Sequence, residues 1–153
     1  NTLIMVGGND WSSAERWIEQ SDTLKFLKDP ANNLAFEAHV YFDKDASGTY
    51  KYSYEEEECY PEKGIDRVKP FVEWIKQNKF HGFIGEYGIP DNDPRWNETL
   101  DLFLGYLQEN GINGTYWAAG PWWDTYFMAI TPKDGKDRPQ MPIIEKYTST
   151  FKK

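Results

Sequence analysis

Strand-like and helix-like segments alternate four times along this chain of 153 residues, and this order limits its possible folds more than any other feature. Such alternation is typical of right-handed βαβ units, in which crossover helices connect neighbouring strands of a parallel sheet. Each unit spans about 35 to 40 residues, close to the length that a βαβ crossover needs. We find no internal repeat, low-complexity stretch or linker. We therefore expect one α/β domain over residues 1–153, built on four parallel strands.

Three of the predicted strands are short apolar runs that contain or end at glycines, and the strand at 34–42 alternates apolar and polar residues. The predicted helices carry apolar residues three and four positions apart. Val68, Phe71, Val72 and Ile75 show the helical spacing, although Pro70 is expected to bend or divide that helix. A loop at 43–64 is long enough to favour a functional role. Strands are predicted at residues 2–8, 34–42, 81–88 and 114–120, and helices at 14–20, 65–78, 94–110 and about 142–151.

The charge balance and the cysteine count exclude several classes of function. Acidic side chains number 25 and basic ones 17, which gives a net charge of −8 with no basic block to bind a phosphate backbone. A single cysteine, Cys59, can form neither an internal disulfide nor a Cys/His zinc framework. No apolar run approaches the roughly 20 residues that span a bilayer. We expect neither nucleic acid nor membrane as a partner, and no metal or other cofactor.

Polar and aromatic residues follow each predicted strand. In parallel α/β folds, ligands collect at the carboxyl ends of the strands, so these residues should share one rim. Flat aromatic faces beside hydrogen-bonding groups suit sugar rings, whose C–H faces are apolar while their hydroxyls need donors and acceptors. The sequence therefore predicts a carbohydrate site formed by Asn9, Trp11, His39, Tyr41, Glu86, Trp117, Trp122 and Trp123.

Glu86 is the sharpest candidate, because it ends an apolar strand between glycines that leave room for a substrate. A structural alternative exists for each candidate. Glu86 could cap a helix or pair with a basic neighbour, and His39 could be a hydrogen-bonded core imidazole. Trp117 could fill the core, while Trp122 and Trp123 could form an ordinary loop cluster. These alternatives stay open on the residues alone.

Four segments in register resemble glycoside hydrolase family 5, the cellulase-type (β/α)8 enzymes. The opening GNDWSSA is similar to that family's fifth strand-loop, with Ser13 where glycine is usual. The order of the segments implies strands five to eight, the second half of a TIM barrel. The other three segments are HVYFD with the following SGT at 39–49, GEYG at 85–88 and YWAAG at 116–120.

This resemblance implies a retaining endo-β-1,4-glucanase that acts on cellulose-like glucans and is secreted. The family's nucleophile corresponds to Glu86, and the pair that orients it corresponds to His39 and Tyr41. The aromatic platform under the sugar ring corresponds to Trp117, and cleft-lining loop positions correspond to Asn9 and Trp11. The chain begins at Asn1 and contains no signal peptide, so we expect a mature or excised segment.

The family's acid/base glutamate stands in an Asn-Glu-Pro motif that this sequence lacks. The most similar segment, Asn-Glu-Thr with Glu98 at its centre, falls in a predicted helix. Retaining hydrolysis needs two carboxyl groups about 5 to 5.5 Å apart. Candidates for the second are Glu37, the acidic run 55–58 and a partner copy's nucleophile. Losing acid assistance costs about 10²- to 10⁴-fold in rate. We expect weak hydrolysis, and the alternative is a non-catalytic carbohydrate-binding half-barrel.

Four parallel strands cannot close a barrel, so the first and last would expose unpaired edges. We expect a homodimer in which the first strand of each copy pairs with the last strand of the other. The rival is completion by a separate N-terminal half. An open binding fold of the flavodoxin type remains a further alternative, although no phosphate-binding glycine motif follows any strand.

Overall fold

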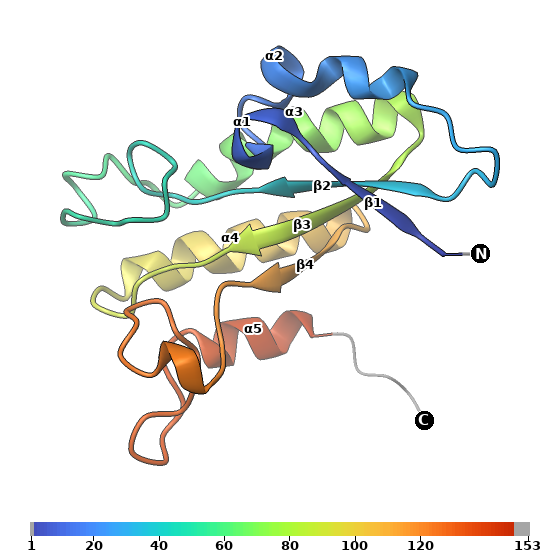
Figure 1. Cartoon of the computed structure of the whole chain (residues 1–153). Coiled ribbons are helices and arrows are strands. Elements are labelled where there is room, and N and C mark those ends of the chain that lie inside the picture. Colours follow the sequence, from blue (N-terminus) through green and yellow to red (C-terminus); the bar gives the residue numbers. More distant parts are fainter. Residues whose placement is uncertain (1, 149–153) are drawn as a thin grey trace.

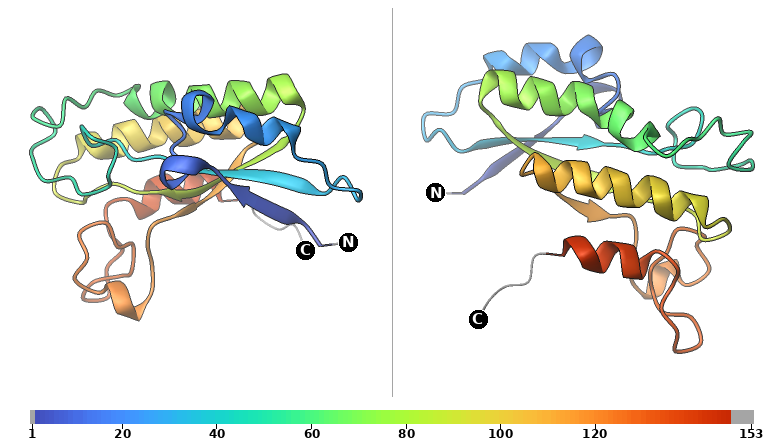
Figure 2. Two further views of the ribbon diagram at one scale, coloured as in Figure 1. Left: turned by 45° about the horizontal axis from the view of Figure 1, so that its top comes forward. Right: turned by 180° about the vertical axis from the view of Figure 1, so that it is seen from behind.

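The computed structural model describes residues 2–148, within which four strands form one parallel sheet in the order β1-β2-β3-β4. Figures 1 and 2 show the main helices lying side by side over one face of this sheet. The strands are β1 (Ile4–Gly7), β2 (Leu34–His39), β3 (His81–Tyr87) and β4 (Asn113–Tyr116). The helices are α1 (Asn9–Ser12), α2 (Trp17–Ser21), η1 (Asp22–Phe26), α3 (Lys63–Asn78), α4 (Arg95–Glu109), η2 (Pro121–Trp123) and α5 (Met141–Tyr147).

The predicted order of strands and crossover helices is confirmed, while several boundaries differ. β2 ends at His39 rather than at residue 42, and β4 stops at Tyr116 rather than at residue 120. α3 runs unbroken through Pro70, where the sequence indicated a bend or a division. α5 ends at Tyr147, and the rest of the helix predicted to reach residue 151 lies largely outside the described residues.

The segment after β1 differs most from the prediction. Asp10, Trp11 and Ser12 have φ angles of 54°, 52° and 57°, in the left-handed region that a right-handed helix does not contain. The chain therefore turns sharply here, and the regular helix begins only at Trp17 rather than at residue 14. One result of the turn is that the Trp11 side chain lies in solvent, 86% exposed.

The core lies between the sheet and its helices and is mainly aromatic. Phe36 of β2 is fully buried and meets Trp74 of α3 edge-on, with ring centroids 5.0 Å apart. Trp17 packs edge-on against the same indole at 5.4 Å. Such pairs contribute packing beyond their buried area. They fix α2 and α3 against β2, which holds the carboxyl end of that strand in place.

The opposite face of the sheet is open. Leu3, Ile4 and Met5 at the β1 edge are 51%, 47% and 45% exposed, although their side chains are apolar. On β2, alternate residues point to opposite faces, so Glu37 and His39 lie on the open side while Phe36 faces the helices. An open apolar face with two free edges is what half of a closed barrel presents. Among the described helices, none combines the length and apolarity needed to cross a membrane.

Candidate functional site

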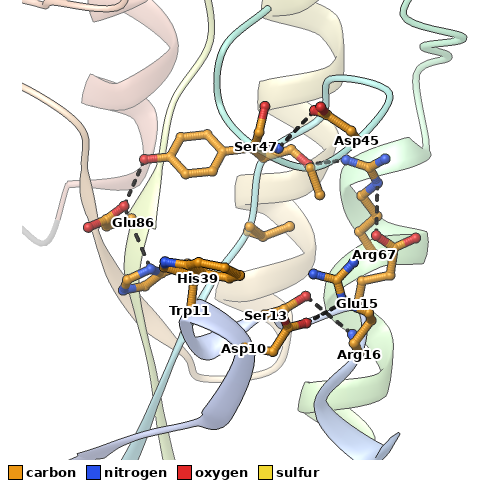
Figure 3. Close-up of a pocket in the computed structure, with 13 residues that line it drawn as sticks. Asp10, Trp11, Ser13, Glu15, Arg16, His39, Asp45, Ser47, Arg67 and Glu86 are labelled. Atoms are coloured by element: carbon orange, nitrogen blue, oxygen red, sulfur yellow. Dashed lines mark hydrogen bonds and ion pairs between the residues drawn. The ribbon is translucent and has the colours of Figure 1, made fainter. Parts of the chain in front are cut away.

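A cavity of about 430 Å³ lies at the carboxyl ends of the strands (Figure 3). Four of the predicted site residues line it, namely Trp11, His39, Tyr41 and Glu86. The rest of its wall comes from the turn after β1, the loop after β2 and helix α3, and it includes the charged residues Asp10, Glu15, Arg16, Asp45 and Arg67. The site is thus assembled from strand ends and the loops that follow them, as expected for a parallel α/β sheet.

A bulge in β3 aims Glu86 at this cavity. Ala38 pairs with Ile84, but the next residue of β2, His39, pairs with Glu86, so Gly85 has no partner. Without the extra residue, Glu86 would share the helix-facing side with Ile84. The bulge places its carboxylate beside His39 on the open face. Strict alternation along the strand could not have predicted this orientation.

Two side chains from β2 and its extension face the Glu86 carboxylate. The Tyr41 hydroxyl donates a hydrogen bond to Glu86 Oε2 at 2.9 Å. His39 Nδ1 lies 3.6 Å from the same oxygen, an electrostatic contact rather than a hydrogen bond. Burial, followed by the charge of Glu86 and the hydrogen bond to it, raises the pKa of Tyr41 well above its usual value. Tyr41 therefore stays protonated and remains a donor to Glu86.

His39 is held between two carboxylates. Its Nε2 lies 2.6 Å from Glu37 Oε1, on the side of the ring opposite Glu86. Burial by itself lowers the pKa of His39, but the hydrogen bond and charge of Glu37 and the charge of Glu86 outweigh it and leave the pKa raised. The surroundings of this imidazole thus favour its protonated form.

The aromatic residues after β4 form a separate group beside the cavity. Trp117 and Trp123 meet edge-on with ring centroids 5.1 Å apart, and Trp123 packs on Tyr126 at 5.0 Å. Burial raises the pKa of Tyr126, and the charge of Glu86 adds to this effect, so this hydroxyl lies within the field of the carboxylate. Trp122 is 90% exposed. Sequence reasoning missed Tyr126, although it lies only three positions after the candidate Trp123.

Asn9 is turned away from the cavity. Its side-chain amide donates to the Gln20 carbonyl at 2.8 Å, and its backbone N–H donates to Ser21 Oγ at 2.9 Å. Both bonds tie the turn after β1 to the end of α2. The geometry therefore gives Asn9 a structural role, and its contact with a sugar stays a prediction.

The acidic run 55–58 is engaged elsewhere and does not line the cavity. Glu55 pairs with Arg95, Glu56 accepts from Ser53, and Glu58 pairs with Lys44. Glu57 is buried and accepts two backbone N–H bonds, those of Lys44 and Tyr52. Across residues 2–148, no group of three or more histidine, cysteine, aspartate or glutamate residues is placed to hold a metal ion.

Comparisons with known proteins identify the family of this chain. Residues 1–122 match the family described as Cellulase (glycosyl hydrolase family 5). The chain is 38% identical over 149 residues to a probable endo-beta-1,4-glucanase B of Aspergillus kawachii, a match that covers 94% of the chain and 43% of the relative. The chain thus spans less than half the length of this relative.

Solved structures give the same result. The endoglucanase Cel5A of Pseudomonas stutzeri, in complex with cellobiose, superimposes with a TM-score of 0.87 at 44% identity, over 98% of this chain and 45% of that one. XacCel5A in complex with cellopentaose superimposes with a TM-score of 0.85 at 39% identity, over 96% and 49%. The four βα units are therefore half of a TIM barrel, and the chain belongs to glycosyl hydrolase family 5.

Proposed function

We propose that this chain provides the nucleophile half of a retaining endo-β-1,4-glucanase. The observation that carries the proposal is the Glu86 carboxylate, which the β3 bulge aims into a cavity and which the Tyr41 hydroxyl holds at 2.9 Å. The relatives' names include endo-β-1,4-glucanase, and two of the solved structures contain cellobiose or cellopentaose. A β-1,4-linked glucan or its oligosaccharides is therefore the proposed substrate.

In the proposed reaction, Glu86 Oε1 attacks the anomeric carbon while Tyr41 holds Oε2. A bond forms between the carboxylate and the anomeric carbon as the glycosidic C–O bond breaks, and the departing oxygen takes a proton from a general acid. Water then gives a proton to the same group, attacks the anomeric carbon and releases Glu86. The Tyr41 hydrogen bond keeps one carboxylate oxygen fixed, which orients the other for attack.

The general acid is not assigned to a residue of this chain. Glu37 is engaged by His39 Nε2 at 2.6 Å, and the acidic run 55–58 lies outside the cavity. We propose that the acid comes from a separate N-terminal half where such a half completes the barrel, and that it then lies about 5 to 5.5 Å from Glu86. The chain alone should then hydrolyse glucan weakly, because loss of the acid costs about 10²- to 10⁴-fold in rate.

The aromatic side chains are proposed to bind the sugar rings. Trp117 lies in the group beside Glu86 and would provide the platform next to the scissile bond, with Trp123 supporting it at 5.1 Å. Trp11 and Trp122 present exposed indole faces farther along the rim. A pyranose stacks on such faces through its apolar C–H groups. A β-1,4-glucan polymer is found outside the cell, so we propose an extracytoplasmic location for this chain.

Cellopentaose hydrolysis followed by proton NMR tests the proposed reaction. Because a glycosyl-enzyme forms and is then opened by water, two inversions occur, so the newly released reducing ends should first appear as the β-anomer. Mutarotation then adds the α-anomer more slowly. First appearance of the α-anomer would contradict a nucleophilic role for Glu86.

A second candidate function is carbohydrate binding without hydrolysis. The exposed indoles of Trp11 and Trp122, at 86% and 90%, favour it because stacking on them needs no general acid. Calorimetry with cellopentaose distinguishes the two functions. Binding that is lost in Trp11→Ala, with no hydrolysis over a long incubation, would support the binding function.

We also propose that a second four-stranded half covers the open face and the exposed residues Leu3, Ile4 and Met5 at the β1 edge. Two copies related by a twofold axis would pair β1 of each with β4 of the other, and a separate N-terminal half is the alternative. Sedimentation equilibrium of the purified chain should give twice the chain mass. A folded monomer at micromolar concentration would contradict the homodimer and favour the separate half.

A further inference from the structure

We infer that Glu37 is a positioning residue for the reaction. Its carboxylate contacts the side of the His39 ring opposite Glu86, and it keeps the imidazole protonated and in place next to Glu86. The inference rests on the proposed role of Glu86 as nucleophile. It assigns a function to a carboxylate that does not itself line the cavity. It also explains why this carboxylate lies on the open face, where a side chain pointing toward a barrel interior would ordinarily be apolar.

The three side chains form a line across the strand ends. Glu37 Oε1 lies 2.6 Å from His39 Nε2, and His39 Nδ1 lies 3.6 Å from Glu86 Oε2. The two carboxylates thus contact opposite nitrogens of one ring. Their side chains are only 17% and 29% exposed, so water screens these charges less than it would at a free surface.

The backbone is shaped to admit the Glu37 side chain. A methyl group at Gly85 would lie 1.7 Å from Glu37 Oε1, so only glycine fits beside the carboxylate at the bulge. A methyl group at Gly7 would lie 3.5 Å from Glu37 Oε2. The carboxylate therefore lies between residues of β1 and β3, its neighbouring strands, in space that the missing side chain of Gly85 leaves open.

The contacts determine the protonation of the ring. A carboxylate at Nε2 accepts a hydrogen bond only if this nitrogen carries a proton. In neutral His39, the lone pair of Nδ1 would then face the Glu86 carboxylate, which is unfavourable. Protonation of Nδ1 removes this conflict and gives an imidazolium between two carboxylates. The pKa of His39 is raised because the hydrogen bond and charge of Glu37 and the charge of Glu86 together outweigh burial, which agrees with this state.

Other charged groups around His39 do not produce the same effect. Tyr41 faces Glu86 as a protonated hydroxyl. Across the cavity, Asp10 pairs with Arg16, and Glu15 lies 3.5 Å from Arg67, so both acids have basic partners. Asp45 is exposed on the loop after β2. The Tyr126 hydroxyl, beside the aromatic group, carries no charge. Glu37 is thus the carboxylate that contacts the far side of the ring.

Histidine NMR on the full chain, with and without the substitution Glu37→Gln, tests the inference without any need for hydrolysis. The chain has two histidines, and His81, at the other end of β3, provides the internal reference. Glutamine keeps the size of the side chain but removes its charge, so His39 should lose its proton at a lower pH than in the wild type. Glu37→Asp keeps the charge but has a shorter side chain, so the midpoint of the His39 titration should fall between those of the wild type and Glu37→Gln.

Kinetics in the active assembly provide the second readout. Because Glu37 does not line the cavity, Glu37→Gln should lower kcat by about 10- to 100-fold, the loss expected for a charge-assisted hydrogen bond, with KM nearly unchanged. The alkaline limb of the pH–rate profile should move to lower pH, as the His39 titration does. Glu73→Gln is the matched control, since it removes the same charge from the exposed surface of α3.

An unchanged His39 titration in Glu37→Gln would overturn the inference, even if glucan hydrolysis by the wild type supports the proposed function. Conversely, the His39 shift would be observed even if Glu86 proved not to be the nucleophile. A shift in both Glu37→Gln and Glu73→Gln would show a general charge effect, and would also overturn the specific role of Glu37.

Discussion

Glu86→Gln should abolish glucan hydrolysis, lowering kcat by about 10⁴-fold or more, as removal of a catalytic nucleophile does in other enzymes. An amide has no negative charge with which to attack the anomeric carbon. Its oxygen can still accept the hydrogen bond that the Tyr41 hydroxyl now donates to Glu86 Oε2, so the site should keep its shape. Release of reducing ends from cellopentaose measures the effect, and calorimetry should show that the sugar still binds.

A matched control and a chemical rescue sharpen this experiment. Glu98→Gln makes the same change on the exposed surface of α4 and should leave kcat unchanged. Glu86→Ala leaves room for a small anion. With an aryl cellobioside and azide, azide should attack in place of the carboxylate and expel the phenolate, giving the α-configured glycosyl azide. Wild-type rates in Glu86→Gln, or no azide adduct from Glu86→Ala in an assembly shown to fold, would contradict the nucleophile.

The order of the elements was predictable because it depends on patterns that the chain carries locally. Alternation of Phe36 and Ala38 with polar residues marked a strand, and the spacing of Val68, Phe71 and Val72 marked a helix. The candidate nucleophile Glu86 was singled out because it stands between glycines at a strand end. The apolar patterns predict the elements correctly because the spacing of apolar residues along the chain determines which face of a strand or helix is buried.

Features that depend on contacts between distant segments could not be predicted in this way. The bulge at Gly85 depends on the fit of Glu37 from the neighbouring strand, and a pattern of period two gives no sign of it. The left-handed turn at Asp10 carries no glycine to mark it. The cavity wall formed by Arg16 and Arg67 has no periodic signal either, because a short turn and a helix supply one arginine each.

The loop after β2 illustrates the same limit and provides the second large prediction. Asp43 is 1% exposed, and its carboxylate accepts hydrogen bonds from the backbone N–H groups of Gly48, Thr49 and Tyr50 at 3.0 to 3.3 Å. The Ser47 hydroxyl also donates to it at 3.0 Å. The sequence identified this segment as a family motif but did not show that one carboxylate holds the loop together.

Asp43→Ala should lower the free energy of unfolding by about 3 to 5 kcal/mol, because it leaves several buried N–H groups without an acceptor. Urea denaturation measures the loss, at one protein concentration in case the chain associates. Asp45→Ala is the control, since Asp45 is exposed and the bond that it accepts from Ser47 N–H at 3.2 Å is local. Its effect should stay within about 0.5 to 1 kcal/mol.

Asp43→Ala should also affect the catalytic site, because the loop that Asp43 holds together packs against the Tyr41 ring. Gly48, at φ 73°, lies against the Tyr41 ring so closely that a methyl group there would be 3.0 Å from it. The Tyr50 hydroxyl accepts from Phe42 N–H and donates to the Gly88 carbonyl, which ties the loop to the end of β3. Loosening the loop frees Tyr41 from Glu86, so Asp43→Ala should lower kcat even in buffer where the protein remains folded. An unfolding free energy within 1 kcal/mol of wild type, with unchanged kcat, would show that Asp43 does not hold this loop.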